Sequence, residues 1–197
     1  MKTGCVLLAA GAGKRFGGSK LLYEVEGEPM ITRALRLYAN FPFAARVCVT
    51  QAREAQIQAL ALERSFTVAI NSDPERGVGT SVSIGTEAVL LMEPDLEGIL
   101  YAVSDQPYLK PASVTVLLET FSKNPERIVS LSYQGTRGNP AVFPRSMFTN
   151  LTQLKEDIGG GAVIRRYPDM LLLVEAGSAR ELEDVDTRDA QSALKRG

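Results

Sequence analysis

One stretch near the N-terminus decides the fold: Val6-Leu7-Leu8-Ala9-Ala10-Gly11-Ala12-Gly13-Lys14-Arg15-Phe16-Gly17-Gly18-Ser19-Lys20. An apolar run of strand length, residues 5–10, leads into four glycines interleaved with Lys14, Arg15 and Lys20. Glycines let backbone N–H groups approach an oxyanion closely, and the basic side chains neutralise its charge. The stretch therefore predicts a buried strand that opens into a phosphate-binding loop, with an ordinary glycine-rich turn as the alternative.

Two familiar phosphate-binding patterns do not fit this spacing. A Walker A loop would require a glycine where Leu8 stands and a hydroxyl residue where Arg15 stands. A dinucleotide fingerprint would require its third glycine where Phe16 stands, and an acidic residue after the second strand, which instead ends in Thr50-Gln51. The spacing disfavours both kinds of site.

The composition indicates a globular chain with a sizeable core. Of the 197 residues, 45% are hydrophobic, and the formal net charge is −1. One domain spanning residues 1–197 is expected at this length. No basic excess favours nucleic acid and no polybasic tract favours a membrane surface, so neither partner is expected. The N-terminus lacks a signal-peptide layout and no apolar run reaches spanning length, which predicts a cytoplasmic protein.

Two residue types constrain the chemistry. The chain has no histidine, which excludes His-based acid–base catalysis, His-activated nucleophiles and His-containing zinc sites. Phosphoryl and nucleotidyl transfer suit such a chain because they depend mainly on positioning and charge neutralisation. The two cysteines, Cys5 and Cys48, fall in predicted buried strands without a Cys-x-x-Cys spacing. They are therefore expected to be core thiols.

The hydrophobic pattern predicts strands that alternate with helices. The order β-α-β-α-β up to residue 70 implies a parallel sheet with helices on both faces. Strands are expected at residues 5–10, 46–50, 66–70, 98–103, 127–133 and 170–174, and residues 134–143 are expected to form a turn that leads into another strand. Helices are expected from Pro29 to Tyr38 and at about 52–62, 81–92, 111–121, 145–154 and 162–167, with a final helix near the C-terminus.

A loop rich in turn formers and hydroxyls, Asn71 to Ser81, precedes the expected helix at 81–92. The N-terminus of a helix presents free N–H groups and a partial positive charge to an anion. The same residues also suit an N-cap by Thr80 or Ser81. From the residues alone the two interpretations remain open.

A carboxylate follows the expected strand at 98–103, in the sequence Ser104-Asp105-Gln106-Pro107. Open α/β sheets bind ligands at the carboxyl ends of their strands. No Lys or Arg follows Asp105 until Lys110, so Asp105 is a candidate Mg²⁺ ligand, with a turn aspartate as the alternative.

The opening stretch resembles a nucleotidyltransferase signature, L-A-A-G-x-G-x-R-x-G-x-x-K, and matches every fixed position from Leu8 to Lys20. Later segments are similar to those of the molybdenum cofactor cytidylyltransferase family, the MobA-like nucleotidyltransferases. Asn71, Gly77, Ser81 and Gly85 match the family's Asn…Gly…Ser…Gly run. Residues 104–107 resemble the family's Gly-Asp-Gln-Pro segment, and residues 137–140 resemble its Arg-Gly-His-Pro segment. Residues 156–161 resemble Gly-Asp-x-Gly-Ala-Arg, and residues 184–187 resemble Asp-Ile-Asp-Thr.

This resemblance implies a single Rossmann-like, three-layer α/β domain with a mostly parallel sheet. It also implies an enzyme that joins CMP from CTP to the phosphate of molybdopterin or molybdenum cofactor and releases pyrophosphate. The product would pass to a molybdenum hydroxylase. The expected metal is Mg²⁺, with Mn²⁺ as the alternative, because both suit oxygen ligands.

The resemblance also assigns roles to individual residues. Arg15 and Lys20 would bind the phosphates, with Asp105 as the third catalytic residue. Asp105 and Asp186 would hold the metal, while Arg137 and Asn139 would bind the acceptor. The nucleotide would lie against a larger set of residues, namely Leu8, Ala9, Ala10, Gly11, Gly13, Asn71, Gly77 and Ser81.

The chain departs from the family pattern at several positions. Ser104 and Glu156 each stand where the family has a glycine, Asn139 stands where it has a histidine, and Gly161 stands where it has an arginine. If the family's arginine contacts the acceptor, that contact is missing in this chain or is made by Arg165 or Arg166 instead. These changes motivate another class of function, a non-catalytic carrier that delivers the cofactor to an apo-hydroxylase.

The nucleotide base and the acceptor also leave alternatives within the enzymes. Guanylyl-transferring relatives usually have Gly where Ala10 stands, and the methyl group favours the smaller pyrimidine by about 10–200-fold. A GTP-using enzyme therefore remains an alternative. The same loop also serves sugar-phosphate and methylerythritol-phosphate nucleotidyltransferases.

Overall fold

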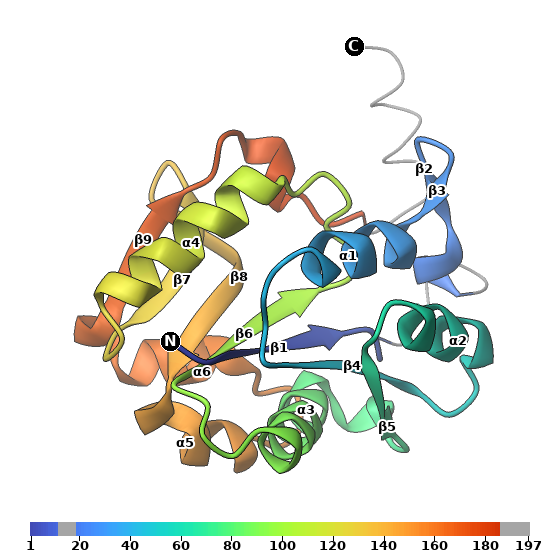
Figure 1. The fold of residues 1–197 in the computed structure, drawn as a ribbon, viewed down its shortest axis with the longest axis horizontal. Coiled ribbons are helices and arrows are strands. Elements are labelled where there is room, and N and C mark those ends of the chain that lie inside the picture. Colours follow the sequence, from blue (N-terminus) through green and yellow to red (C-terminus); the bar gives the residue numbers. More distant parts are fainter. Residues whose placement is uncertain (12–18, 186–197) are drawn as a thin grey trace.

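The computed structural model describes residues 1–11 and 19–185 and has a seven-stranded sheet at its centre, in the order β5-β4-β1-β6-β8-β7-β9 (Figure 1). Its strands are β1 (Thr3–Leu8), β4 (Ala45–Gln51), β5 (Thr67–Asn71), β6 (Gly98–Val103), β7 (Ile128–Tyr133), β8 (Thr136–Pro144) and β9 (Leu171–Glu175). Only β8 runs against its neighbours within this sheet. The predicted mostly parallel α/β fold is confirmed.

The sheet forms because its central strands are apolar on both faces, as a buried parallel sheet requires. Successive side chains of a strand point to opposite faces. In β1, Cys5 and Leu7 join one hydrophobic cluster, and Val6 joins the other. β4 alternates in the same way, with Cys48 facing the first cluster and Val49 the second. The sheet thus separates two cores.

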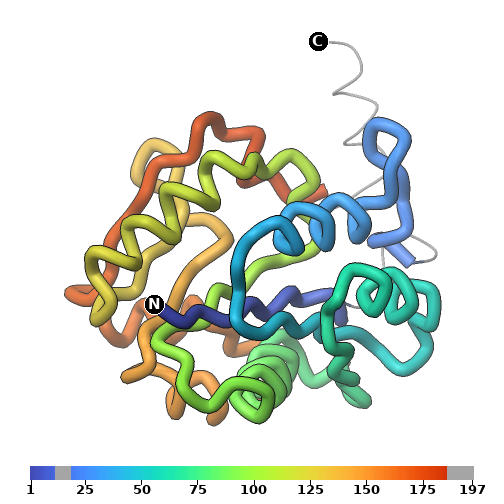
Figure 2. Tube along the Cα trace, viewed as in Figure 1, coloured from blue at the N-terminus to red at the C-terminus, as the bar shows by residue number. Residues whose placement is uncertain are grey.

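Helices cover both faces, giving three layers (Figures 1 and 2). The cluster that contains Leu7 also receives buried side chains of α1 (Met30–Ala39), α2 (Ala55–Glu63) and α4 (Pro111–Lys123). The cluster that contains Val6 receives those of α3 (Val78–Met92), α5 (Phe148–Thr152) and α6 (Gly160–Arg166). Because all strands of the sheet except β8 are parallel, the loops that follow their carboxyl ends lie at one edge of the sheet. Folds of this kind bind ligands at that edge.

Strand β8 brings a distant segment to that same edge. It pairs with β6 from Gly98–Pro144 to Tyr101–Ala141, and with β7 through a hairpin closed by Tyr133 and Thr136. Positive φ angles of 48° and 75° at Gln134 and Gly135 suit the two-residue turn, whose twist matches the strands. Because β8 is antiparallel to β6, it begins where β6 ends.

Helix α3 begins at Val78, three residues before the predicted start. Gly77 stands at the N-cap position with a φ of 102°, a conformation that favours glycine. The alternative in which Thr80 or Ser81 caps the helix is therefore wrong, because both residues lie inside it. The predicted helix at 145–154 is also interrupted, and forms a 3-10 turn, η3 (Arg145–Met147), followed by the short α5.

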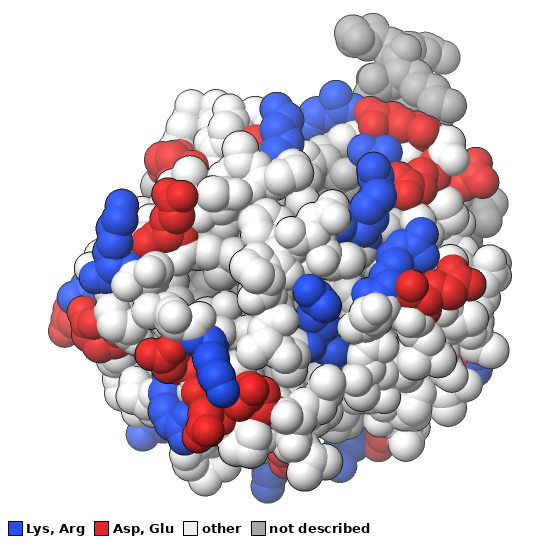
Figure 3. All heavy atoms as spheres, in the orientation of Figure 1, with Lys and Arg blue, Asp and Glu red and all other residues white. Residues whose placement is uncertain are grey.

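The remaining elements are small. A two-stranded ribbon, β2 (Glu24–Val25) and β3 (Glu28–Pro29), precedes α1. The described residues also form the 3-10 turns η1 (Lys20–Leu22), η2 (Pro74–Arg76), η4 (Pro168–Met170) and η5 (Ala179–Leu182). No helix among the described residues is long and apolar enough to span a bilayer. Basic and acidic side chains are interspersed on the face shown in Figure 3, as the small net charge leads one to expect.

Candidate nucleotide-binding site

The chain that leaves β1 is held by its neighbours on both sides. The N–H of Ala9 donates to the carbonyl of Val49 over 2.7 Å. The side-chain amide of Gln51, only 4% exposed, donates to the carbonyls of Ala10, at 2.8 Å, and Gly11, at 3.2 Å. The start of the predicted phosphate loop is therefore fixed by β4.

Ser104 fixes the same segment from the other side. Its hydroxyl, 2% exposed, donates to the carbonyl of Leu8 over 2.8 Å. The residue that departs from the family glycine thus links the end of β1 to the end of β6. Neither Gln51 nor Ser104 was predicted as a site residue. The available signal was a polar residue at the end of an apolar strand.

Lys20 and Asp105 form the charged centre of the site. Lys20 Nζ lies 2.8 Å from Asp105 Oδ2, and their side chains are 14% and 27% exposed. Lys20 precedes the ribbon and Asp105 follows β6, so residues far apart in sequence meet here. The sequence around Asp105 contains no Lys or Arg before Lys110, yet the fold places the ammonium group of Lys20 beside the Asp105 carboxylate.

Asn71 organises the next segment. Its buried amide donates to the hydroxyls of Thr80 and Ser81, each over 2.9 Å, and its carbonyl accepts the N–H of Asp73. The hydroxyl of Thr80 donates to the carbonyl of Gly77 over 2.7 Å. Asn71 also pairs with Gln51 in the sheet, and the side chain of Gln51 donates to the carbonyls of Ala10 and Gly11. The segment that begins at Asn71 therefore lies near the loop after β1. The structure thus brings Asn71, Gly77 and Ser81 together, and their predicted contact with a nucleotide stays a prediction.

A second loop packs closely against the start of α3. The N–H of Gly79 donates to the carbonyl of Glu156 over 2.9 Å. A Cβ atom on Gly79 would lie 2.7–2.8 Å from three carbonyl oxygens of residues 155–158, and one on Gly77 would lie 2.5 Å from the backbone of Asp157. These two glycines are therefore required by the close approach of backbone.

The predicted acceptor residues lie near the beginning of β8. Arg137 is exposed, and its guanidinium lies over Gly161 of α6. Asn139 is half-buried and precedes Pro140 in the same strand. Arg137 thus borders the carboxyl edge of the sheet, on the far side of β6 from β1.

The C-terminal segment returns to Asp105. Gln106 donates to the carbonyl of Leu182 over 3.0 Å and to Asp184 Oδ1 over 2.9 Å, and the N–H of Val185 donates to the carbonyl of Asp105 over 3.0 Å. Three predicted site residues, Gly13, Arg15 and Asp186, lie outside the described residues.

The buried thiols take no part in this site. Burial raises the pKa of the Cys48 thiol to about 12 and raises the pKa of Cys5 as well. Both side chains are fully buried in the cluster beneath α1. They are inert core residues, as the sequence predicts.

The donor set fits a hard divalent cation in part. Asp105 supplies a carboxylate at the carboxyl end of a central strand. The described ranges, 1–11 and 19–185, hold no group of three or more His, Cys, Asp or Glu residues arranged to bind a metal. Mg²⁺ commonly uses one or two carboxylates together with substrate phosphates, so a single described carboxylate is compatible with it.

Comparison with known proteins gives relatives along most of the chain. The protein named "Purine catabolism protein PucB" from Bacillus subtilis is 27% identical, over 97% of this chain and 95% of its own. "Nicotine blue oxidoreductase" from Paenarthrobacter nicotinovorans is 30% identical, over 92% and 91%. "Probable molybdenum cofactor guanylyltransferase" from Thermococcus gammatolerans is 28% identical, over 60% and 56%.

Solved structures share the fold. The crystal structure of Rv0371c from Mycobacterium tuberculosis has a TM-score of 0.80 at 24% identity, covering 98% of this chain and 97% of its own. A complex of that protein with manganese has a TM-score of 0.76 at 22% identity, covering 98% of both chains. The sequence model of the MobA-like NTP transferase domain matches residues 5–171. The chain belongs to the MobA-like NTP transferase family.

Proposed function

We propose that this nucleotidyltransferase transfers CMP from CTP to the phosphate of molybdopterin or molybdenum cofactor. The observation that carries the proposal is the Lys20–Asp105 pair, placed beside the fixed start of the loop after β1. A cation and a carboxylate at this point suit the handling of a nucleotide's phosphates. The family supports nucleotidyl transfer, and the acceptor follows from the resemblance of the later motifs.

The chain's own residues act mainly through position and charge. The acceptor phosphate would attack the α-phosphorus of the nucleotide, and pyrophosphate would leave. A phosphate monoester is already largely anionic at neutral pH, so no general base is needed, in agreement with a chain that has no histidine. Lys20 and Arg15 would neutralise charge on the α-phosphoryl group and the leaving pyrophosphate.

Asp105 and Asp186 would hold a divalent cation, which supplies charge neutralisation at the phosphate oxygens when bound. Mg²⁺ and Mn²⁺ both suit these ligands. The manganese complex of Rv0371c supports divalent metal binding in a protein of this fold.

The choice of base rests on Ala10. Its side chain is 4% exposed and packs in the cluster that contains Val6. The methyl group narrows the space next to it compared with a glycine, which favours the smaller pyrimidine. GTP remains the second candidate nucleotide, and the name of the Thermococcus relative favours it. The two nucleotides are therefore compared directly in the experiment.

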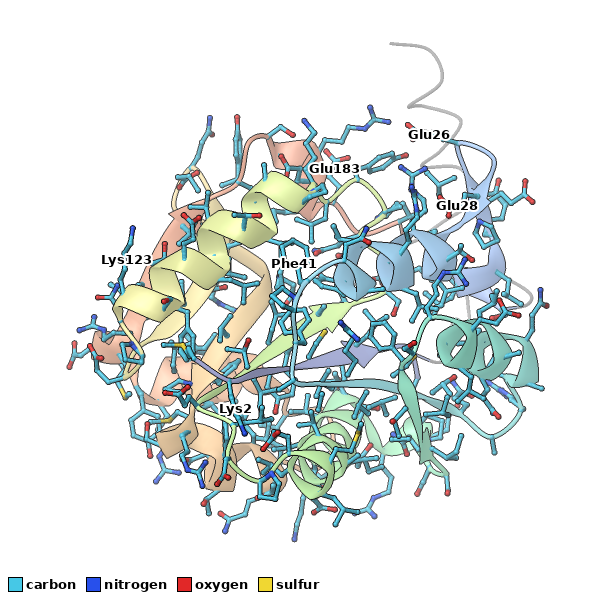
Figure 4. All side chains as sticks on the ribbon, in the orientation of Figure 1. Lys2, Glu26, Glu28, Phe41, Lys123 and Glu183 are labelled. Carbon is cyan, nitrogen blue, oxygen red and sulfur yellow. The ribbon has the colours of Figure 1, made fainter. Side chains whose placement is uncertain are left out.

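The experiment measures pyrophosphate release with molybdopterin and Mg²⁺ or Mn²⁺, comparing CTP, GTP and ATP. We expect release with CTP and a loss of at least about 100-fold in Lys20→Ala or Asp105→Ala, the effect of removing one preorganised electrostatic group. Lys123→Ala is the matched control, because Lys123 lies at the far end of α4 (Figure 4). Release with GTP alone would overturn the assignment of CTP, and equal activity of all variants would overturn the role of the pair.

The same experiment also distinguishes the proposed activity from two functions of other classes. The name of the Paenarthrobacter relative suggests an oxidoreductase, which would change the oxidation state of its substrate without releasing pyrophosphate. The departures at Ser104, Asn139 and Gly161 raise a cofactor carrier, which would bind molybdopterin tightly without turnover. Pyrophosphate release that depends on Asp105 would exclude both as the main activity.

A further inference from the structure

One arginine of α1 joins the two chain segments that carry the charged centre. Arg33 Nε donates to the carbonyl of Pro107 over 3.0 Å, and its Nη1 donates to the carbonyl of Val25 over 3.1 Å. Pro107 lies shortly after Asp105 in the chain, and Val25 lies in the ribbon that follows Lys20. A single guanidinium group therefore connects the segment after β6 to the segment after Lys20.

The Arg33 side chain is itself held at both ends. Its backbone belongs to α1, whose buried face packs in the core beneath the sheet. Its Nη2 donates to Glu26 Oε2 over 3.0 Å, and the side chain is 20% exposed. A guanidinium group is planar and carries its N–H donors in a fixed arrangement. Its hydrogen bonds therefore set both the distance and the direction between the two carbonyls.

Apolar packing brings the same segments together but does not orient them. Val25 of the ribbon, Met30 of α1 and Val185 of the C-terminal segment form a small buried cluster, against which Tyr23 and Tyr108 pack. Burial of apolar surface is non-directional, so such a cluster tolerates small shifts of its members. The directional contacts at this junction come from the guanidinium group of α1.

The charged centre needs directional support of this kind. Lys20 stands in a single 3-10 turn and Asp105 in the loop after β6, and the two groups meet at 2.8 Å. A lysine side chain is a flexible stem, so the position of its charge depends on how the backbone below it is held. A displacement of about 1 Å in a reacting group can lower a rate by about 100-fold.

We propose that Arg33 is a positioning residue that holds Lys20 and Asp105 in the geometry required for nucleotidyl transfer. Its donors are directed at two carbonyls and a carboxylate of the chain itself, so it acts through the pair and not on the substrate. The effect on turnover rests on the proposed function, whereas the link between the two segments does not.

Helix α1 offers a matched control one turn further along. Arg36 Nη2 donates to Glu28 Oε2 over 2.7 Å, so Arg36 also joins α1 to the ribbon, where Figure 4 labels Glu26 and Glu28. Arg36→Gln therefore removes an ion pair between the same two elements and leaves the contact with Pro107 in place.

Two further variants separate the charge of Arg33 from its geometry. Glu26→Gln removes the ion pair of Arg33 but keeps both carbonyl acceptors, and an exposed ion pair contributes little. Arg33→Lys keeps the charge but replaces two donor nitrogens in a fixed arrangement with a single ammonium nitrogen. Arg33→Gln removes the charge and the arrangement together.

The first measurement needs no substrate. Hydrogen exchange of the full chain, followed by NMR, reports two amides: Tyr23 N–H donates to the carbonyl of Lys20 over 3.1 Å, and Val185 N–H donates to the carbonyl of Asp105 over 3.0 Å. We expect Arg33→Lys and Arg33→Gln to raise both exchange rates by about tenfold, with the amides of β7 unchanged as the reference for global unfolding. Arg36→Gln and Glu26→Gln should match the wild type. Unchanged exchange at either amide in the Arg33 variants would overturn the link.

The second measurement follows pyrophosphate release. We expect kcat to fall by about 10- to 100-fold in both Arg33 variants, with a smaller change in the KM for the nucleotide, because correctly placed charges act mainly on the transition state. In a Lys20→Ala background the two losses should not add, because residues that act as a unit are non-additive. Turnover of Arg33→Lys equal to that of the wild type, or fully additive losses, would overturn the positioning role. If the wild type releases no pyrophosphate with any nucleotide, the proposed function fails and the catalytic role of Arg33 with it, while hydrogen exchange still decides whether Arg33 links the two segments.

Discussion

At the scale of single residues, the side chain of Gln51 contributes to the site without a charge. Its buried amide donates to two consecutive carbonyls of the segment after β1. Replacing Gln51 by Leu would leave both carbonyl oxygens without that donor, at a cost of about 1–3 kcal/mol in the free energy of unfolding. We also expect weaker nucleotide binding, because the loop after β1 would lose its anchor on β4.

Chemical denaturation and nucleotide titration check this prediction. Gln56→Leu is the control, since Gln56 is exposed on α2. A variant at Gln51 that loses stability but binds nucleotide normally would show that the amide only supports the core.

The sequence placed the charged residues of the site better than it placed the neutral ones. Asp105 was predicted from its position after an apolar strand, and Lys20 from the spacing of the glycine-rich stretch. Gln51 and Ser104 were missed because their roles depend on which strands lie beside β1. That arrangement cannot be read from local hydrophobic patterns, since periodicity describes one element at a time.

At the scale of elements, the contact between α3 and the loop at 155–158 depends on Gly79. Within a helix, Gly→Ala ordinarily stabilises by about 1 kcal/mol. Here a Cβ would press against three carbonyl oxygens, so we expect the opposite sign, a loss of about 1–3 kcal/mol. Thermal unfolding measures the change, with Glu87→Ala, exposed on the same helix, as the control. A stabilised Gly79→Ala variant would contradict the close approach.

The hairpin between β7 and β8 depends on pH through Glu175 of β9. Its carboxylate accepts hydrogen bonds from the N–H groups of Gly135 and Gln134 and from the hydroxyl of Ser132, and these hydrogen bonds lower its pKa below the ordinary value of a glutamate. A lowered pKa in the folded state contributes stability that is present above the unfolded pKa. That stability is lost as the pH falls through the folded value.

Glu175→Gln should therefore lose less free energy of unfolding than the wild type when the pH falls from about 6 to about 3. Denaturation at a series of pH values measures this difference. Glu126→Gln is the control, because Glu126 is exposed and lies just before β7. Parallel pH profiles for the wild type and Glu175→Gln would contradict the role of these hydrogen bonds.

At the scale of the whole molecule, the site depends on segments that cross the fold. The alternation of strands and helices predicted the parallel half of the sheet, and β6 has the predicted bounds of 98–103. The place of β8 between β6 and β7 was not predicted, because the order of strands in a sheet depends on tertiary pairing. The meeting of Arg137 with Arg165, and of Val185 with Asp105, follows from that topology.

A buried carboxylate, that of Glu181, also contacts the part of the fold to which the C-terminal segment returns. Glu181, 1% exposed, accepts the hydroxyl of Ser113 over 2.5 Å and the N–H of Lys110 over 3.2 Å, at the beginning of α4. A negative charge is stabilised at the N-terminus of a helix. In Figure 2 the red segment after β9 passes from the edge of the sheet toward α1.

Glu181→Gln keeps the size of the side chain but removes its charge and introduces an N–H donor beside groups that already donate. We expect a loss of about 1–3 kcal/mol in the free energy of unfolding. We also expect faster hydrogen exchange at Val185, whose N–H donates to the carbonyl of Asp105. Glu183→Gln, exposed on the same segment, should change neither quantity. If Glu181→Gln lowers stability while the exchange at Val185 stays slow, the carboxylate stabilises α4 alone, and another contact must hold the C-terminal segment beside Asp105.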